Sequence, residues 1–222
     1  MVRRSPPRQP VLAPGRATPA VVYRPPQPTV SIVFDIGTGA GLATATGVRP
    51  FLPPLLAGAL ARGDIGPLDF DGSGWQFLES PGFLVAVLAL AVVAYLAERS
   101  GVDRRALQIG TAVVAGALGV LLFGGVMAAA DGPELVGMAA GGFCVALALG
   151  VVGGLLERAS RRLDDSAAGL LVVYADAAAL ALAAVAIFLP PVAFLALIAL
   201  LVLAARGRRG GDEKYAGLRI LR

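Results

Sequence analysis

Two residues of opposite charge lie inside apolar stretches of this chain, where they could form an ion pair or bind a solute. Arg49 interrupts a long apolar segment near the N-terminus, and Asp176 lies near the middle of the apolar run from Ala167 to Phe188. A charge at membrane depth is costly unless it is paired or hydrated, so such residues usually face the interior of a helical bundle. We therefore expect Arg49 and Asp176 to face one another. Tyr174 or Thr46 would complete their hydrogen bonds.

Such a pair is consistent with two different functions. It can lie on the pathway of a small solute or an ion, which would make the protein a permease or a channel. It can also fix the packing of the helices and nothing else, which would suit a membrane protein that organises lipids or partner proteins. In either case, removing one charge leaves the other without a counter-charge and costs ~3–5 kcal/mol.

The other candidate residues carry weaker signals. Asp35 lies in the first turns of its expected helix, where it can interact with the helix N-terminus near the cytoplasmic face. Glu98 ends an apolar run beside an arginine, and Cys144 lies in an apolar run, where a free cysteine acts as a small hydrophobe. The acidic loop 64–80 lacks the spacing of a calcium loop, and the chain has no histidine. We expect no metal, no cofactor and no enzymatic activity.

One segment looks like a cofactor-binding motif. Residues 33–41, VFDIGTGAG, are similar to the strand and glycine loop that open the cofactor site of S-adenosylmethionine-dependent methyltransferases. Further strands and soluble amphipathic helices should follow in that fold. Apolar runs of membrane length follow instead, so a methyltransferase is only a remote alternative.

The composition places these residues in a membrane protein. The chain is 57% hydrophobic and 15% charged, with a mean hydropathy of +0.77, whereas a soluble domain is about 25% charged. Several apolar runs are long enough to cross a hydrocarbon layer of ~30 Å as helices. We predict one all-α transmembrane bundle at residues 30–206, with the lipid bilayer as its surroundings.

Two polar segments flank this bundle. Residues 1–29 are rich in proline and arginine, so they are expected to be disordered, or to precede the native start of the protein. Residues 207–222 form a basic tail that we place in the cytoplasm. The net charge of +4 comes from arginines in the termini and short loops, as the positive-inside rule describes, so no nucleic-acid partner is expected.

The distribution of arginine predicts the topology. Arginine-rich and arginine-poor connections alternate without exception if residues 31–63 cross the membrane once, as a helix broken at Gly47-Val48-Arg49-Pro50. The result is about six spans in the inner (plasma) membrane with both termini in the cytoplasm. Two short crossings in this segment would instead make seven spans.

Six crossings divide into two sets of three, and the second set would then run inverted. Gly47–Arg62 resembles Gly142–Arg158, and Ser80–Glu98 resembles Ser166–Ala184 in outline. Inverted repeats around broken helices recur in transporters. An inverted 3+3 repeat is therefore an open alternative.

Two segments carry a resemblance to a known family. Residues 47–56, GVRPFLPPLL, and 214–221, KYAGLRIL, are similar to parts of the bacterial domain-of-unknown-function family 4126, as is Ser80-Pro81 with Glu98 beyond it. The likeness covers roughly residues 31–222. The late span departs from the family pattern, because Ala175 stands where the family often has a glutamate. The resemblance implies a small integral membrane protein and brings no established activity.

Overall fold

The computed structural model describes residues 29–155 and 165–216, and this part of the chain is helical with short connections. The all-α prediction is therefore confirmed. The helices are α1 (Thr29–Val48), α2 (Leu52–Arg62), α3 (Pro81–Arg99), α4 (Arg104–Ala129), α5 (Glu134–Ala148), α7 (Asp165–Phe188) and α8 (Pro190–Ala216), with a short 3-10 helix, η1 (Gln76–Glu79), and a π-helical turn, η2 (Leu149–Gly153).

Three helical stretches are long and apolar enough to cross a membrane, namely Pro81–Arg99, Arg105–Ala129 and Glu134–Gly153. Shorter apolar stretches occur in α1, α7 and α8. These helices are consistent with a membrane protein, as the composition predicts. Of the two predicted flanks, residues 1–28 and 217–222 lie outside the described part of the chain, and α8 continues beyond residue 206 to Ala216.

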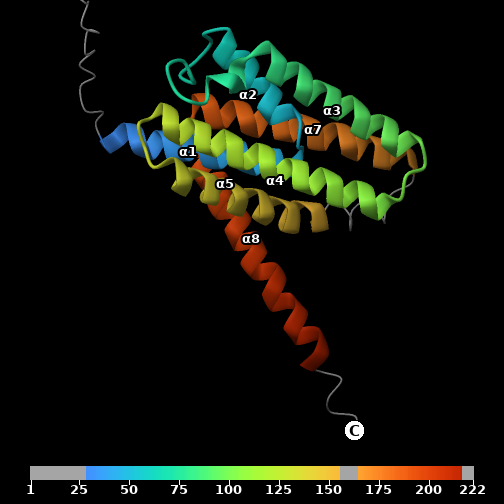
Figure 1. Ribbon diagram of the computed structural model, residues 1–222. Coiled ribbons are helices and arrows are strands. Elements are labelled where there is room, and N and C mark those ends of the chain that lie inside the picture. Colours follow the sequence, from blue (N-terminus) through green and yellow to red (C-terminus); the bar gives the residue numbers. More distant parts are fainter. Residues whose placement is uncertain (1–28, 156–164, 217–222) are drawn as a thin grey trace, which may run out of the picture.

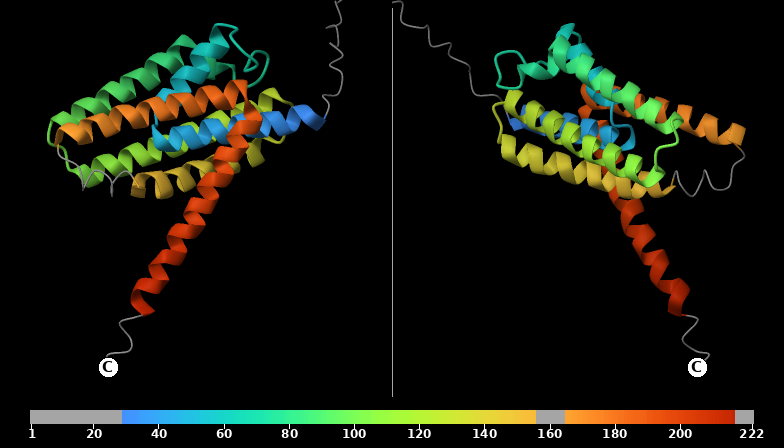
Figure 2. Two further views of the ribbon diagram at one scale, coloured as in Figure 1. Left: turned by 180° about the vertical axis from the view of Figure 1, so that it is seen from behind. Right: turned by 45° about the vertical axis from the view of Figure 1, so that its right-hand side comes forward.

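Helix α1 runs through the middle of the bundle (Figures 1 and 2), and its residues 37–47 are all buried. It packs against α4 and α5 on one side and against α7 and α8 on the other. One core cluster joins Leu42 to α2, α4, α7 and the loop before α3, and a second one joins α1 to α4 and α5. Helix α3 lies at the outside of the bundle, and α8 leads away from it.

The segment that contains Arg49 is a hairpin. Helix α1 ends with a backbone bond from Arg49 N–H to the Ala45 carbonyl, 2.9 Å. Pro50 cannot continue this pattern because it has no N–H, and the chain turns and starts α2 with a proline in its first turn. Helix α2 then runs back beside α7 toward the end of the bundle where α1 begins (Figure 1).

This hairpin corrects two predictions. Asp35 and Thr38 of α1 line the same cavity as residues 67–71, which follow α2, so both ends of the hairpin lie at one end of the bundle. A single crossing of residues 31–63 as a broken helix is therefore wrong. Asp35 also lies beside the acidic loop and not at the opposite face, so α1 does not begin at the end where the arginine-rich loop between α3 and α4 lies (Figure 1).

Two further sequence similarities do not match the local structure. Residues 33–41 lie within α1 and not in a strand and a glycine loop, so the methyltransferase motif is not formed. Residues 47–62 contain the bend and α2, whereas the segment that resembles them runs without a turn from α5 into η2 as far as it is described. The inverted repeat thus gains no support from these segments.

Candidate functional site

The structure brings Arg49 and Asp176 together. The Arg49 Nε atom lies 2.5 Å from the Asp176 Oδ1 atom, and the side chains are 29% and 41% exposed, respectively. Arg49 comes from the bend between α1 and α2, and Asp176 lies halfway along α7. The ion pair therefore links an interruption of the helical backbone to the middle of an apolar helix. It neutralises both charges at that depth.

The two residues expected to support the pair, Thr46 and Tyr174, lie in different surroundings. Thr46 is fully buried, but its hydroxyl donates to the Leu42 carbonyl of its own helix at 2.8 Å. Tyr174 is 72% exposed. Residues two apart on an α-helix point about 200° apart, so the side chain of Tyr174 lies on the face of α7 opposite to that of Asp176. The structure therefore gives no support to Tyr174 as a partner of the pair, and a supporting role for Thr46 stays a prediction.

A cavity of about 420 Å³ opens at the end of the bundle where α1 begins. Its polar side chains come from α1 and from the loop between α2 and α3, and its apolar walls come mainly from α4 and α7. The lining residues are Phe34, Asp35, Thr38, Pro67, Leu68, Asp69, Asp71, Val126, Ala129, Ala130, Ile187, Phe188 and Pro190. Three of them are carboxylates and none is basic, so the cavity has a negative potential.

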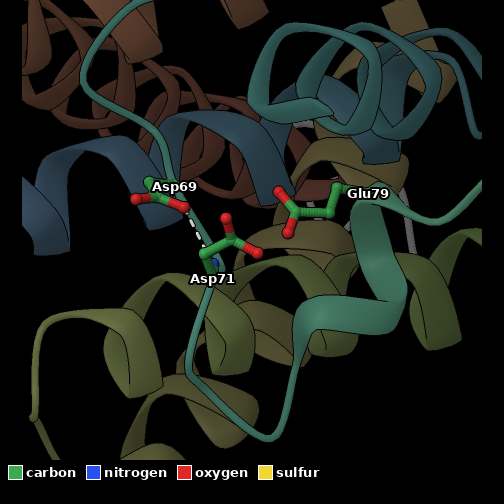
Figure 3. A group of neighbouring side chains, drawn as sticks. All are labelled: Asp69, Asp71 and Glu79. Carbon is green, nitrogen blue, oxygen red and sulfur yellow. Dashed lines mark hydrogen bonds between the residues drawn. The ribbon is translucent and has the colours of Figure 1, made fainter. Parts of the chain in front are cut away.

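Asp69 and Asp71 also belong to a group of three carboxylates with Glu79 (Figure 3). Oxygen atoms from all three residues lie within 4.8 Å of one another. The Asp71 N–H donates to Asp69 Oδ1 at 2.8 Å, and the Gln76 side-chain amide donates to Asp71 Oδ1 at 2.5 Å. We call this group the acidic trio. Carboxylates are the ligands that hard cations take, but here they also interact with one another.

The acidic trio changes the protonation of Glu79. This side chain is only 9% exposed, and burial is the main cause that raises its pKa above 4.5. A hydrogen bond with Asp71 and the negative charges of Asp71 and Asp69 raise the pKa further, whereas a backbone hydrogen bond from Phe70 lowers it. The trio therefore holds a proton more readily than three separate carboxylates would.

Sequence reasoning missed this trio because it judged the loop by the spacing of its carboxylates. The loop folds back on the bundle because Leu68, Phe70 and Leu78 are buried in the core cluster. Apolar and acidic residues alternate at Leu68-Asp69-Phe70-Asp71. This alternation was the available signal, since it places both aspartates on the side opposite to the buried side chains.

The last two candidates lie apart from the ion pair. Glu98 is exposed near the end of α3 and lines a separate cavity of about 470 Å³ with residues at the start of α4. Cys144 is buried in the second core cluster, as expected for a cysteine that acts as a small hydrophobe. Neither residue lines the cavity that contains Asp35 or the one that contains Asp71 and Glu79.

Comparison with known proteins gives one match. No curated protein and no solved structure matches the chain. The family model described as a domain of unknown function, DUF4126, matches residues 36–209, which include most of the hairpin, the ion pair and the acidic trio. This family is the one that residues 47–56 and 214–221 resemble. The chain therefore belongs to the DUF4126 family.

Proposed function

We propose that this protein is a small membrane permease whose pathway passes the Arg49–Asp176 pair. One observation carries this proposal: the pair lies where the backbone of the α1–α2 hairpin turns, beside the middle of α7. Backbone that is not helical is tolerated at membrane depth only where protein buries it or where it lines a watery cavity. Ionisable residues at that depth usually mark the pathway of a solute, an ion or a proton.

A polar face of α1 leads from the cavity lined by Asp35 and Thr38 to the ion pair; we call this cavity the outer cavity. Positions 35, 38, 42, 46 and 49 follow the spacing of one face of an α-helix, and four of them hold polar residues, the exception being Leu42. The first two positions line the cavity, and the last is Arg49. The facing helix α7 carries Asp176, Ala179, Ala183 and Ile187 at the same spacing, so two small side chains lie between the cavity and the pair.

The positive-inside rule orients this pathway. Arg99, Arg104 and Arg105 lie around the connection between α3 and α4, at the end of the bundle opposite to the acidic loop. We place these arginines in the cytoplasm of a bacterium and the acidic loop outside its inner membrane. The α1–α2 hairpin then enters from the outside and returns there, so α1 begins outside, in contrast to the cytoplasmic N-terminus expected from the arginine pattern. The spans are α3, α4, α5 with η2, α7 and α8, which makes five crossings in addition to the hairpin.

Cysteine accessibility tests the proposed pathway. In a Cys144→Ala background, Thr46→Cys and Ala179→Cys place thiols on the facing sides of α1 and α7. A charged, membrane-impermeant thiol reagent should label both in proteoliposomes. Val92→Cys, on the exposed apolar face of α3, is the matched control and should stay unlabelled because lipid covers it. A protein that labels at Ser73→Cys in the loop but at neither interior position would contradict the proposal.

The second candidate is a membrane protein that organises partners and transports nothing. The observation that favours it is α3, whose apolar window is only 6% buried within the bundle. Val85, Val93 and Leu96 are among the large side chains that this helix exposes. This candidate predicts a dry interior in the labelling experiment. It also predicts that polar residues at Val85 and Val93 abolish an association that wild-type protein shows in the membrane.

A further inference from the structure

We infer that the pathway carries cations and that Leu42 and Ile187 form the hydrophobic gate that closes it below the outer cavity. This inference rests on the proposed permease function and adds to it the class of solute and the residues that close the path. Three observations carry it: the charge of the cavity lining, the position of Leu42 on α1, and the complete burial of both gate residues.

The cavity selects the sign of the solute. Asp35 comes from α1, whereas Asp69 and Asp71 come from the loop, so carboxylates approach the cavity from two separate elements. No lysine or arginine is among its lining residues. A concave site lined by charges of one sign concentrates counter-ions at its mouth. Cations are therefore enriched at the outer end of the path, and anions are repelled there.

Leu42 is the apolar exception on the polar face of α1. Thr38 lies one turn above it at the cavity, and Thr46 lies one turn below it toward Arg49. Positions 35, 38 and 46 of this face are polar, and Leu42 is the only large apolar side chain among them. Leu42 is fully buried and belongs to the same core cluster as Ile187. Leu42 therefore lies between the cavity and the polar residues near Arg49, where an apolar side chain can exclude water.

Ile187 completes the seal from α7. It is fully buried, and it also lines the cavity, so it forms part of the cavity floor. Below it on the same face of α7, Ala183 and Ala179 are small and buried. The bulky side chains of Leu42 and Ile187 therefore lie directly below the cavity, and the small side chains of α7 lie between them and the ion pair. Constrictions of this kind close channels by excluding water without blocking the whole path with protein.

Ion flux into proteoliposomes tests the gate on the full-length chain. Leu42→Ser should raise potassium flux at least about tenfold over the wild type, because a hydroxyl lets water cross the constriction. Leu42→Ala, a milder variant, should raise it less. Val145→Ser, equally buried but in the second core cluster, should lower thermal stability without raising flux. Asp35→Asn added to Leu42→Ser should reduce the potassium flux several-fold without reducing the chloride flux.

Two results would overturn the inference, each in a different way. Leu42→Ser and Leu42→Ala proteins that are monodisperse but no leakier than Val145→Ser would show that Leu42 is not the gate. Equal potassium and chloride fluxes through Leu42→Ser would show that the path is not cation-selective. If Thr46→Cys and Ala179→Cys are labelled from water no faster in Leu42→Ser than with Leu42 intact, the pathway stands and only the gate fails. If they are labelled in neither background, the permease function fails as well.

Discussion

The ion pair and the acidic trio differ in how their charged side chains are stabilised within a mostly apolar protein. Arg49 and Asp176 lie halfway along the bundle and have opposite signs. Asp69, Asp71 and Glu79 lie at the end of the bundle, where all three have the same sign. Charges far from water need a counter-charge because nothing else solvates them. Carboxylates next to water can instead share protons and solvent, so like charges are tolerated there.

The comparison predicts opposite responses to the removal of a charge. In the pair, each charge stabilises the other, so neutralising one destabilises the protein. In the trio, each negative charge repels the others, so neutralising one of them stabilises the protein.

The largest effect is expected at the ion pair. Asp176→Ala and Arg49→Ala should each lower the free energy of unfolding by about 3 kcal/mol, because each leaves an ion without its partner. The exchanged pair, Arg49→Asp with Asp176→Arg, should recover part of this loss. Thermal unfolding in detergent measures both. Yields of Asp176→Asn and of the exchanged protein that both equal the wild type would contradict a structural role for the pairing.

A smaller effect of opposite sign is expected at the trio. Asp69→Asn should raise the melting temperature at pH 7 by about 1–2 °C, since it removes a like charge near the surface. Asparagine keeps the oxygen that accepts the Asp71 N–H bond, so the loop geometry is preserved. Asp64→Asn, in the same loop but outside the trio, is the control and should change nothing. Destabilisation by Asp69→Asn, with the control neutral, would mean that the trio is held by something other than shared protons.

The smallest effect is a dependence of stability on pH. The pKa of Glu79 is higher in the folded protein than its ordinary value of 4.5, so the folded state binds more protons in the interval between the two. The contribution of Glu79 to stability is therefore complete below pH 4.5 and is lost as the pH rises through the folded pKa. Glu79→Gln should flatten the melting temperature over this interval, as measured by unfolding at a series of pH values. An unchanged slope would assign the dependence to another group.

The sequence predicts the helices and the pairing of Arg49 with Asp176 for the same physical reason. Apolar runs of sufficient length become helices in lipid, and two isolated opposite charges within them lower their energy by meeting. Local rules also suffice to exclude Tyr174, because its position relative to Asp176 on α7 follows from helical periodicity alone.

The hairpin and the trio depend on contacts that local rules do not determine. An apolar segment broken by Pro50, Pro53 and Pro54 can kink and continue, or it can turn and return. The packing of α2 against α7 and α3 decides between the two. The trio forms because Leu68 and Leu78 are both buried in the core, which brings Glu79 close to Asp69 and Asp71. The three carboxylates are not regularly spaced in the sequence, so no local pattern predicts this contact.

The position of Arg49 in the hairpin has a consequence for the synthesis of the chain, because its partner is made much later. Asp176 comes more than a hundred residues later, which at about 5–20 residues per second is a delay of many seconds. During that time Arg49 lacks the Asp176 carboxylate as a counter-charge. The first two helices to be made therefore wait for α7 to complete their charge pair, and a chain that stops before that helix should be less stable than the full chain.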